Sequence, residues 1–271
     1  MKKKITALCL CVALLAIAVV GASLAYFTDT AEATNTFAVG NVKIDLIEQE
    51  RMLDADGNKT TELKAFDNGH KLYPIVGSAQ GEKDALGMPT AENYVDKMVT
   101  IQNTGSEAAY IRAYFAIPAA LDDGYETFNA GLNVLHFNFG NKVVNGVISS
   151  TEGVEWQWTH GSKWNYFETT IDGIKYNVYY ADYYQAVEAG ATTERFVDGV
   201  YLDKSFNIKD GKAYAFGEEI TLDEGWNWNS VSCPVFAVAC QAEGFDNAAA
   251  AMDAAFGAKY NPWGTEATNW Q

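Results

Sequence analysis

The stretch "YVDKMVTIQNTGSEAAYIRAYFAIP", residues 94–118, decides the fold class of this chain. Apolar and polar residues alternate on both sides of "NTG", and Val95, Val99 and Ile101 share one face of the first half. In the second half every other residue is again apolar, namely Ile111, Ala113, Phe115 and Ile117. A period of two is typical of half-buried strands, and Asn, Gly and Ser favour a tight turn. We therefore predict an antiparallel hairpin over residues 95–117.

The same period of two continues along most of the chain after residue 40, beginning with Val42, Ile44 and Leu46. Further strand-like runs cover residues 132–139, 154–159, 174–180, 196–202, 214–222 and 231–241. Short segments rich in Gly, Asn and Asp separate these runs and supply turn residues. Many short strands between such turns predict an all-β fold, a jelly-roll-like antiparallel β-sandwich.

Two segments depart from this alternation. Residues 50–93 are polar and poorly periodic, so we expect a long excursion with short strands at most. The alanine-rich run "DNAAAAMDAAF", residues 246–256, predicts a short helix with Asp246 as its N-cap and Gly257 as its stop. This run directly follows the last predicted strand, so the helix should cover an end or an edge of the sandwich. Short helices are thus expected only at the periphery.

The first 25 residues have the three parts of a secretory signal peptide. Three lysines precede an apolar run over residues 5–20, and the small residues Ser23 and Ala25 follow it. We predict cleavage between Ala25 and Tyr26 and secretion to the cell surface or extracellular matrix, with membrane contact only during export. An uncleaved anchor is the alternative, because about 17 apolar residues are at the short limit for spanning a bilayer. The predicted parts are a signal peptide (1–25), an N-terminal donor-strand segment (26–40) and one jelly-roll domain (41–271).

The predicted mature chain is strongly acidic. The whole chain has a formal net charge of −16, and loss of the three leader lysines leaves 16 Lys and Arg against 35 Asp and Glu, or −19. Nucleic acids and anionic lipids are polyanions, so such a surface argues against both as partners. It favours solubility outside the cell.

Residues suited to catalysis form no recognisable pattern, and we predict no catalytic residues and no enzyme activity. The three histidines, His70, His136 and His160, show no two-histidine spacing, and the sequence has no G-x-S-x-G or phosphate-binding loop. Cys233 and Cys240 lie seven residues apart in one predicted strand, which at ~3.3 Å per residue exceeds disulfide reach. They are expected to be buried apolar cysteines.

One acidic loop is the metal candidate of the sequence. "DADGNKTTE", residues 54–62, places Asp54, Asp56 and Asn58 at alternate positions, as in part of a calcium loop. An EF-hand needs Gly at its sixth position and Glu at its twelfth, where this chain has Lys59 and Ala65. A solvated Asp-Gly-Asn turn is the favoured interpretation. No cofactor is therefore predicted, with calcium at these three side chains as the alternative.

Aromatic residues gather in "VEWQWTHGSKWNYF", residues 154–167. Four of them have a polar tip and could form a ligand platform, namely Trp156, Trp158, Trp164 and Tyr166. Such rings are also ordinary fillers of a sandwich core. Trp156 and Trp158 share one face with Val154, which favours burial. The platform interpretation leads to an alternative function, a cell-surface adhesive or carbohydrate-binding β-sandwich.

The segment that follows the leader is lightly apolar and contains no Gly or Pro before Gly40. At Gly40 the apolar parity shifts from that of Phe37 and Val39 to that of Val42. A change of parity at a glycine indicates a bulge or a bend between two extended pieces. The first piece can therefore pair separately from the second.

Three stretches of the chain resemble the TasA/camelysin family of secreted matrix proteins, whose signal peptides are cleaved by a dedicated signal peptidase. The first stretch is "YFTD" at residues 26–29 with "NTFAVG" at residues 35–40. The second is residues 97–118, in which a strand and Asn-Thr-Gly precede a strand that contains Arg112. The third is residues 235–257, with a late strand, Gln-Ala-x-Gly-Phe and the alanine-rich helix. By contrast, "YPIVG" at residues 73–77 lacks the family's Pro-Gly turn.

The resemblance implies a jelly-roll subunit that self-assembles into extracellular biofilm fibres. In such fibres the N-terminal strand of one subunit completes the sheet of the next, which gives a head-to-tail homopolymer. Phe27, Phe37 and Val39 would anchor the exchanged strand, and an accessory fibre subunit or a polysaccharide would be a further partner. Pairing of residues 26–39 within their own chain, or disorder, is the alternative to exchange. Some family members have been classed as metallopeptidases, and this chain offers no ligand set for that activity.

Overall fold

Antiparallel strands make up most of the protein in a computed structural model, which describes residues 28–32, 35–37, 42–122, 133–140, 143–144, 147–148, 155–160, 163–223 and 231–264. All pairings between named strands in these ranges are antiparallel. The described helices are one short α-helix (α2, Ala248–Phe256) and one 3-10 turn (η1, Ala119–Leu121). The predicted all-β antiparallel sandwich is thus confirmed.

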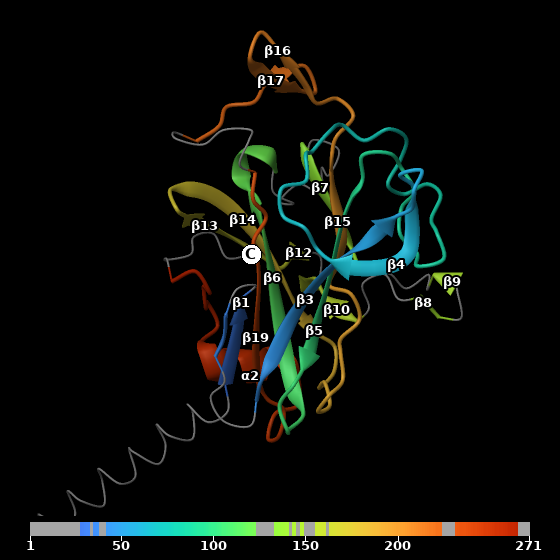
Figure 1. Ribbon diagram of the computed structural model, residues 1–271. Coiled ribbons are helices and arrows are strands. Elements are labelled where there is room, and N and C mark those ends of the chain that lie inside the picture. The colour runs from blue at the N-terminus through green and yellow to red at the C-terminus, as the bar shows by residue number, and fades with distance from the viewer. Residues whose placement is uncertain are drawn as a thin grey trace, which may run out of the picture.

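Two large sheets form the sandwich (Figure 1). The first sheet has the order β10-β14-β6-β19-β1-β2, and β13 also pairs with β14. Its strands are β10 (Trp156–Gln157), β14 (Ile174–Tyr183), β6 (Ala109–Pro118), β19 (Val235–Gln241), β1 (Thr28–Glu32), β2 (Asn35–Phe37) and β13 (Tyr166–Ile171). The N-terminal strand thus lies next to a strand from near the C-terminus.

The second sheet has the order β4-β3-β5-β15-β7. Its strands are β4 (Lys59–Ala65), β3 (Ile44–Leu53), β5 (Val95–Asn103), β15 (Val197–Leu202) and β7 (Leu135–Phe139). Three minor sheets comprise β16 (Asn207–Lys209) with β17 (Lys212–Ala215) and β18 (Glu218–Glu219), β8 (Val143–Val144) with β9 (Val147–Ile148), and β11 (Thr159–His160) with β12 (Lys163–Trp164). The β16–β18 sheet extends from the top of the sandwich in Figure 1.

The predicted hairpin over residues 95–117 is wrong, although both of its strands exist. β5 belongs to the second sheet and β6 to the first, so the turn between them carries the chain across the sandwich. Asn103 supports this corner, because its buried side-chain amide donates to the carbonyls of Glu107 and Val187, each at 2.8 Å. Alternation indicated the two strands and the residues that face the main core, and it could not show which strand pairs with which.

The main core fills the space between the two sheets. Every other residue of β6 and of β19 points into this space, and so do Val99 and Ile101 of β5. Buried apolar residues on the opposite face of β6 and β19 form a second cluster on the outer face of the first sheet, where α2 packs with its buried Ala251 and Met252. The alanine-rich helix therefore covers one outer face of the sandwich.

The excursion predicted over residues 50–93 covers part of the outer face of the second sheet. Ile75, Met88 and Tyr94 pack on Met98 of β5 and form a third apolar cluster. The excursion is shorter than predicted, because residues 50–65 belong largely to the regular strands β3 and β4. The helix also begins later than predicted, at Ala248, because the side chain of Asn247 caps it by accepting the amide of Ala250 at 2.9 Å.

Candidate functional site

The N-terminal segment pairs with its own chain in the described structure. β1 is antiparallel to β19, with Thr28 opposite Cys240 and Glu32 opposite Phe236. β2 then returns along the outer side of β1, with Phe37 opposite Thr30. Pairing within the chain was the alternative that the sequence left open. Of the predicted exchange and cleavage residues, Ala25, Tyr26, Phe27 and Val39 lie outside the described residues.

β19 lies between two strands of the first sheet, and β1 covers one of its two edges. Its other edge pairs with β6 along seven residues, from Val235 opposite Phe115 to Gln241 opposite Ala109. The side chains from Val235 to Cys240 are all buried, because alternate ones enter the main core and the cluster under α2. Removal of β1 would leave a row of unpaired amides and carbonyls beside two apolar clusters. An open edge of this kind accepts an added strand readily.

The sequence that connects β1 and β2 differs from the turn sequences of three other hairpins. Three hairpins turn at Asp172-Gly173, Asp210-Gly211 and Phe216-Gly217, and both residues of each turn have positive φ. The pair Glu32–Asn35 leaves Ala33-Thr34 as the connection between β1 and β2. Two-residue hairpin turns favour Gly, Asn or Asp, and a β-branched residue such as Thr is a poor choice. The residue types of this connection therefore suit a two-residue turn less well than the Gly-containing pairs of those three hairpins.

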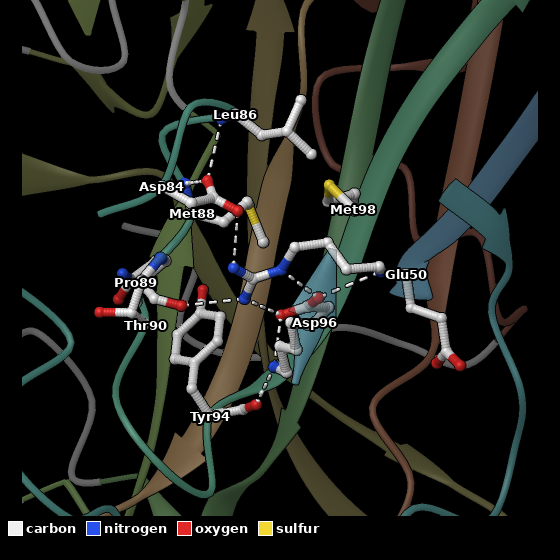
Figure 2. A network of polar contacts seen from close by, with 12 residues as sticks. Glu50, Asp84, Leu86, Met88, Pro89, Thr90, Tyr94, Asp96 and Met98 are labelled. Carbon is white, nitrogen blue, oxygen red and sulfur yellow. Dashed lines mark hydrogen bonds and ion pairs between the residues drawn. The ribbon is translucent and has the colours of Figure 1, made fainter. Parts of the chain in front are cut away.

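A buried network of charged side chains lies between the excursion and the second sheet (Figure 2). Arg51, near the end of β3, donates from Nε and Nη2 to the two carboxylate oxygens of Asp96, each at 2.7 Å. Its Nη1 donates to Asp84 at 2.9 Å, and its Nη2 also reaches the carbonyl of Pro89 at 2.9 Å. Lys59 Nζ adds a contact of 2.8 Å to Asp96. These contacts fasten the excursion to the sheet.

Mutual pairing shifts the pKa values of this network. Burial by itself raises the pKa of Asp96, but hydrogen bonds and charges from Arg51 and Lys59 outweigh it and hold that pKa below its ordinary value. Burial lowers the pKa of Lys59, and the charge of Asp96 opposes this shift only in part. Each buried charge has an opposite charge in contact, so the network suits a structural role.

Sequence reasoning missed this network. Lys59 was noted only as a departure from a calcium loop, while Arg51 and Asp96 lie 45 residues apart in the chain. The available signal was Asp96 within a predicted strand, where a charged residue needs a partner if it is buried, whereas Arg51 lies in the stretch 50–93 that shows no alternation.

The acidic loop forms a turn that is capped by its own carboxylate. Asp54 Oδ1 accepts the backbone amides of Asp56 at 3.0 Å and Asn58 at 2.8 Å, and all three residues are exposed. The carbonyl of Asp54 also accepts the amide of Gly57. An ion at this carboxylate would have to compete with these hydrogen bonds. Among the described residues, no group of three or more His, Cys, Asp or Glu side chains is placed to hold a metal ion.

Most of the predicted aromatic platform lies inside the sandwich. Trp156, Trp158 and Tyr166 are buried in the main core, and Trp164 is half-buried against it. The ring of Trp158 stacks on Phe196 with centroids 4.4 Å apart, and Trp156 donates from Nε1 to the carbonyl of Glu194 at 3.0 Å. Three of the four rings are thus occupied by core contacts.

Comparisons of the chain with protein-family models, with curated proteins and with solved structures give no match. The fold itself defines the class as an all-β antiparallel sandwich. Within the part of the chain that is described, no helix is both long enough and apolar enough to cross a membrane.

Proposed function

We propose that the protein is a secreted structural subunit that assembles into extracellular matrix fibres, with the N-terminal strand of one copy completing the first sheet of the next. The observation that carries this proposal is the position of β1, an N-terminal strand that closes the one free edge of β19. The hydrogen bonds of a strand pair are the same whether the two strands belong to one chain or to two. The pairing with β19 can therefore pass to a neighbouring copy without a new fold.

Strand exchange also allows the β1–β2 segment, residues 28–37, to adopt one extended conformation. As a hairpin, β1 covers the part of β19 from Phe236 to Cys240. In extended form, residues 28–37 span roughly 34 Å, compared with roughly 24 Å for β19. A straight segment can therefore pair along the whole of β19, and it does not require Ala33-Thr34, whose residue types suit a two-residue turn poorly, to reverse the chain.

Cleavage of the leader is part of the proposal. β1 begins at Thr28, two residues after the predicted new N-terminus at Tyr26. A strand can leave its own sheet and enter another copy only if one of its ends is free, and cleavage supplies that end. Because each copy donates at one place and accepts at another, the contact is head-to-tail and does not close, so it produces filaments.

The test compares two mature forms of the protein by electron microscopy. The chain that begins at Tyr26 should form filaments, whereas the chain that begins at Gly40 should form none while keeping the circular dichroism of a β-protein. A peptide of residues 26–39, added in excess, should inhibit filament growth of the Tyr26 chain by occupying β19. Identical behaviour of the two chains would refute strand exchange.

A further inference from the structure

The second sheet ends in an open edge at β4. Among the described residues, only β3 forms a strand pair with β4, and six of the seven β4 residues are exposed. Figure 1 shows β4 at the margin of the sandwich. An exposed edge strand can pair with another chain unless its side chains prevent it.

The backbone of β4 shows which of its groups are free to pair. The amide of Phe66, directly after β4, donates to the carbonyl of Glu48 at 3.0 Å. Hydrogen-bonded positions alternate along an antiparallel pair, so Lys64 also directs its amide and carbonyl toward β3. Leu63 and Ala65 then direct theirs away from the sheet. An added strand must therefore form its hydrogen bonds with the backbone of Leu63 and Ala65.

The side chains of β4 fit a second copy of the same strand. In an antiparallel pair centred on Leu63, Glu62 of each copy lies opposite Lys64 of the other. Glu62 makes no ion pair within the described residues, and Lys64 is 46% exposed although it contacts Glu50 at 2.8 Å. Centring the pair on Ala65 would instead place Leu63 opposite Asp67, and centring it on Thr61 would place Leu63 opposite Lys59. Only the Leu63 register brings opposite charges together.

We propose that β4 is a self-association surface at which two copies of the chain pair their edges about a two-fold axis at Leu63. The side chain of Leu63 is 39% exposed and would pack on Leu63 of the second copy. Met52 and Leu53, at the end of β3 in the same hairpin, are 38% and 60% exposed and add apolar surface. This pairing joins the second sheet of one copy to the second sheet of the other copy, which gives one continuous sheet.

The contact would be weak between single copies and strong between filaments. A pair of edge strands buries less than the roughly 1,200–2,000 Å² of a stable interface. Repetition of the contact along a filament raises its effective strength, because each later contact forms within an existing complex. Lateral joining of filaments rests on the proposed function, whereas pairing of two copies through β4 does not.

Disulfide trapping in the mature chain tests the register. In a Cys233→Ser background, Leu63→Cys should give a covalent dimer on mild oxidation, because the two copies of residue 63 lie opposite each other at a distance suited to a disulfide. Thr61→Cys is the matched control on the same edge, since residue 61 lies opposite residue 65 in this register. We expect at least tenfold more dimer from Leu63→Cys than from Thr61→Cys.

The double variant Thr61→Cys/Ala65→Cys should again cross-link, because residue 61 of each copy then lies opposite the cysteine at position 65 of the other. Equal yields from the two single variants, or no dimer from either, would overturn the proposal.

Charge reversal gives a second measurement. Glu62→Lys places two lysines opposite each other and should reduce the fraction of dimer in sedimentation equilibrium at least tenfold. Glu218→Lys on β18 changes the net charge equally at another exposed position and should leave the dimer unchanged. Filaments that form without cross-linking at position 63 would count against the β4 contact alone. Cross-linking at position 63 without filaments would count against strand exchange alone.

Discussion

Thr28 and Cys240 lie directly opposite each other in the antiparallel strands β1 and β19. Cys240 is buried, and burial raises the pKa of its thiol to about 12. The pair links the residue that opens β1 to a cysteine near the end of β19. A second cysteine at position 28 would therefore report which chain supplies the strand that pairs with β19.

We predict that Thr28→Cys, in a Cys233→Ser background, forms a disulfide with Cys240. Opposite residues of antiparallel strands have Cα atoms about 4.5–5.5 Å apart, which is within disulfide range. In monomers the bond should close within one chain, and in filaments it should link successive subunits into a ladder on a non-reducing gel. Oxidation needs a catalyst at alkaline pH, because the raised pKa keeps the Cys240 thiol protonated. A filament sample that contains only the intrachain bond would contradict exchange.

Improving the β1–β2 turn should slow assembly. The double variant Ala33→Asn/Thr34→Gly introduces the residues that a two-residue hairpin prefers and should stabilise the hairpin by about 1 kcal/mol. We expect the rate of filament growth, followed by light scattering, to fall about fivefold. Thr34→Ser is the control, because it introduces neither the asparagine nor the glycine of the preferred turn. Faster growth of the double variant would mean that the hairpin itself is the assembling form.

Asp96→Asn should destabilise the protein by about 3–5 kcal/mol in urea unfolding at pH 7, because Arg51 and Lys59 lose their shared buried partner. The pKa of Asp96 is lowered in the folded protein, so its stabilising contribution is complete above the ordinary carboxyl pKa of about 3.9 and is lost as the pH falls toward the lower folded value. The difference between wild type and variant should therefore shrink below about pH 4. Asp56→Asn, at an exposed position, is the control and should show no such difference.

Two tryptophan variants separate the core from a ligand platform. Trp158→Ala should lower the free energy of unfolding by about 3–5 kcal/mol, because Trp158 is buried and stacked on Phe196. Trp164→Ala should cost less, since Trp164 is half-buried. Tryptophan fluorescence titrated with polysaccharide measures the alternative function. A spectral shift that is lost in a stably folded Trp164→Ala variant would support an adhesive or carbohydrate-binding role.

Sequence reasoning located several local features and missed contacts between distant segments. The helix near the C-terminus was predicted within two residues of its start, because alanine content is a local signal, but its N-cap is Asn247 and not the predicted Asp246. The strand runs before and after "NTGSE" were also found, but their pairing was not. The Arg51–Asp96 contact joins side chains that are 45 residues apart, so a charged residue in a predicted strand indicates that a partner is needed but does not identify it.

The sequence by itself determined the all-β class, because alternation of apolar residues over short runs between turn residues is typical of extended strands. It could not determine the partner of each strand, since β5 and β6 bury equally suitable faces in the same core from opposite sheets. Only the tertiary structure placed β1 on β19 and left β4 as an open edge. The physical reason is that strand pairing is made by backbone groups that every residue shares, so the choice among partners depends on how the whole chain packs.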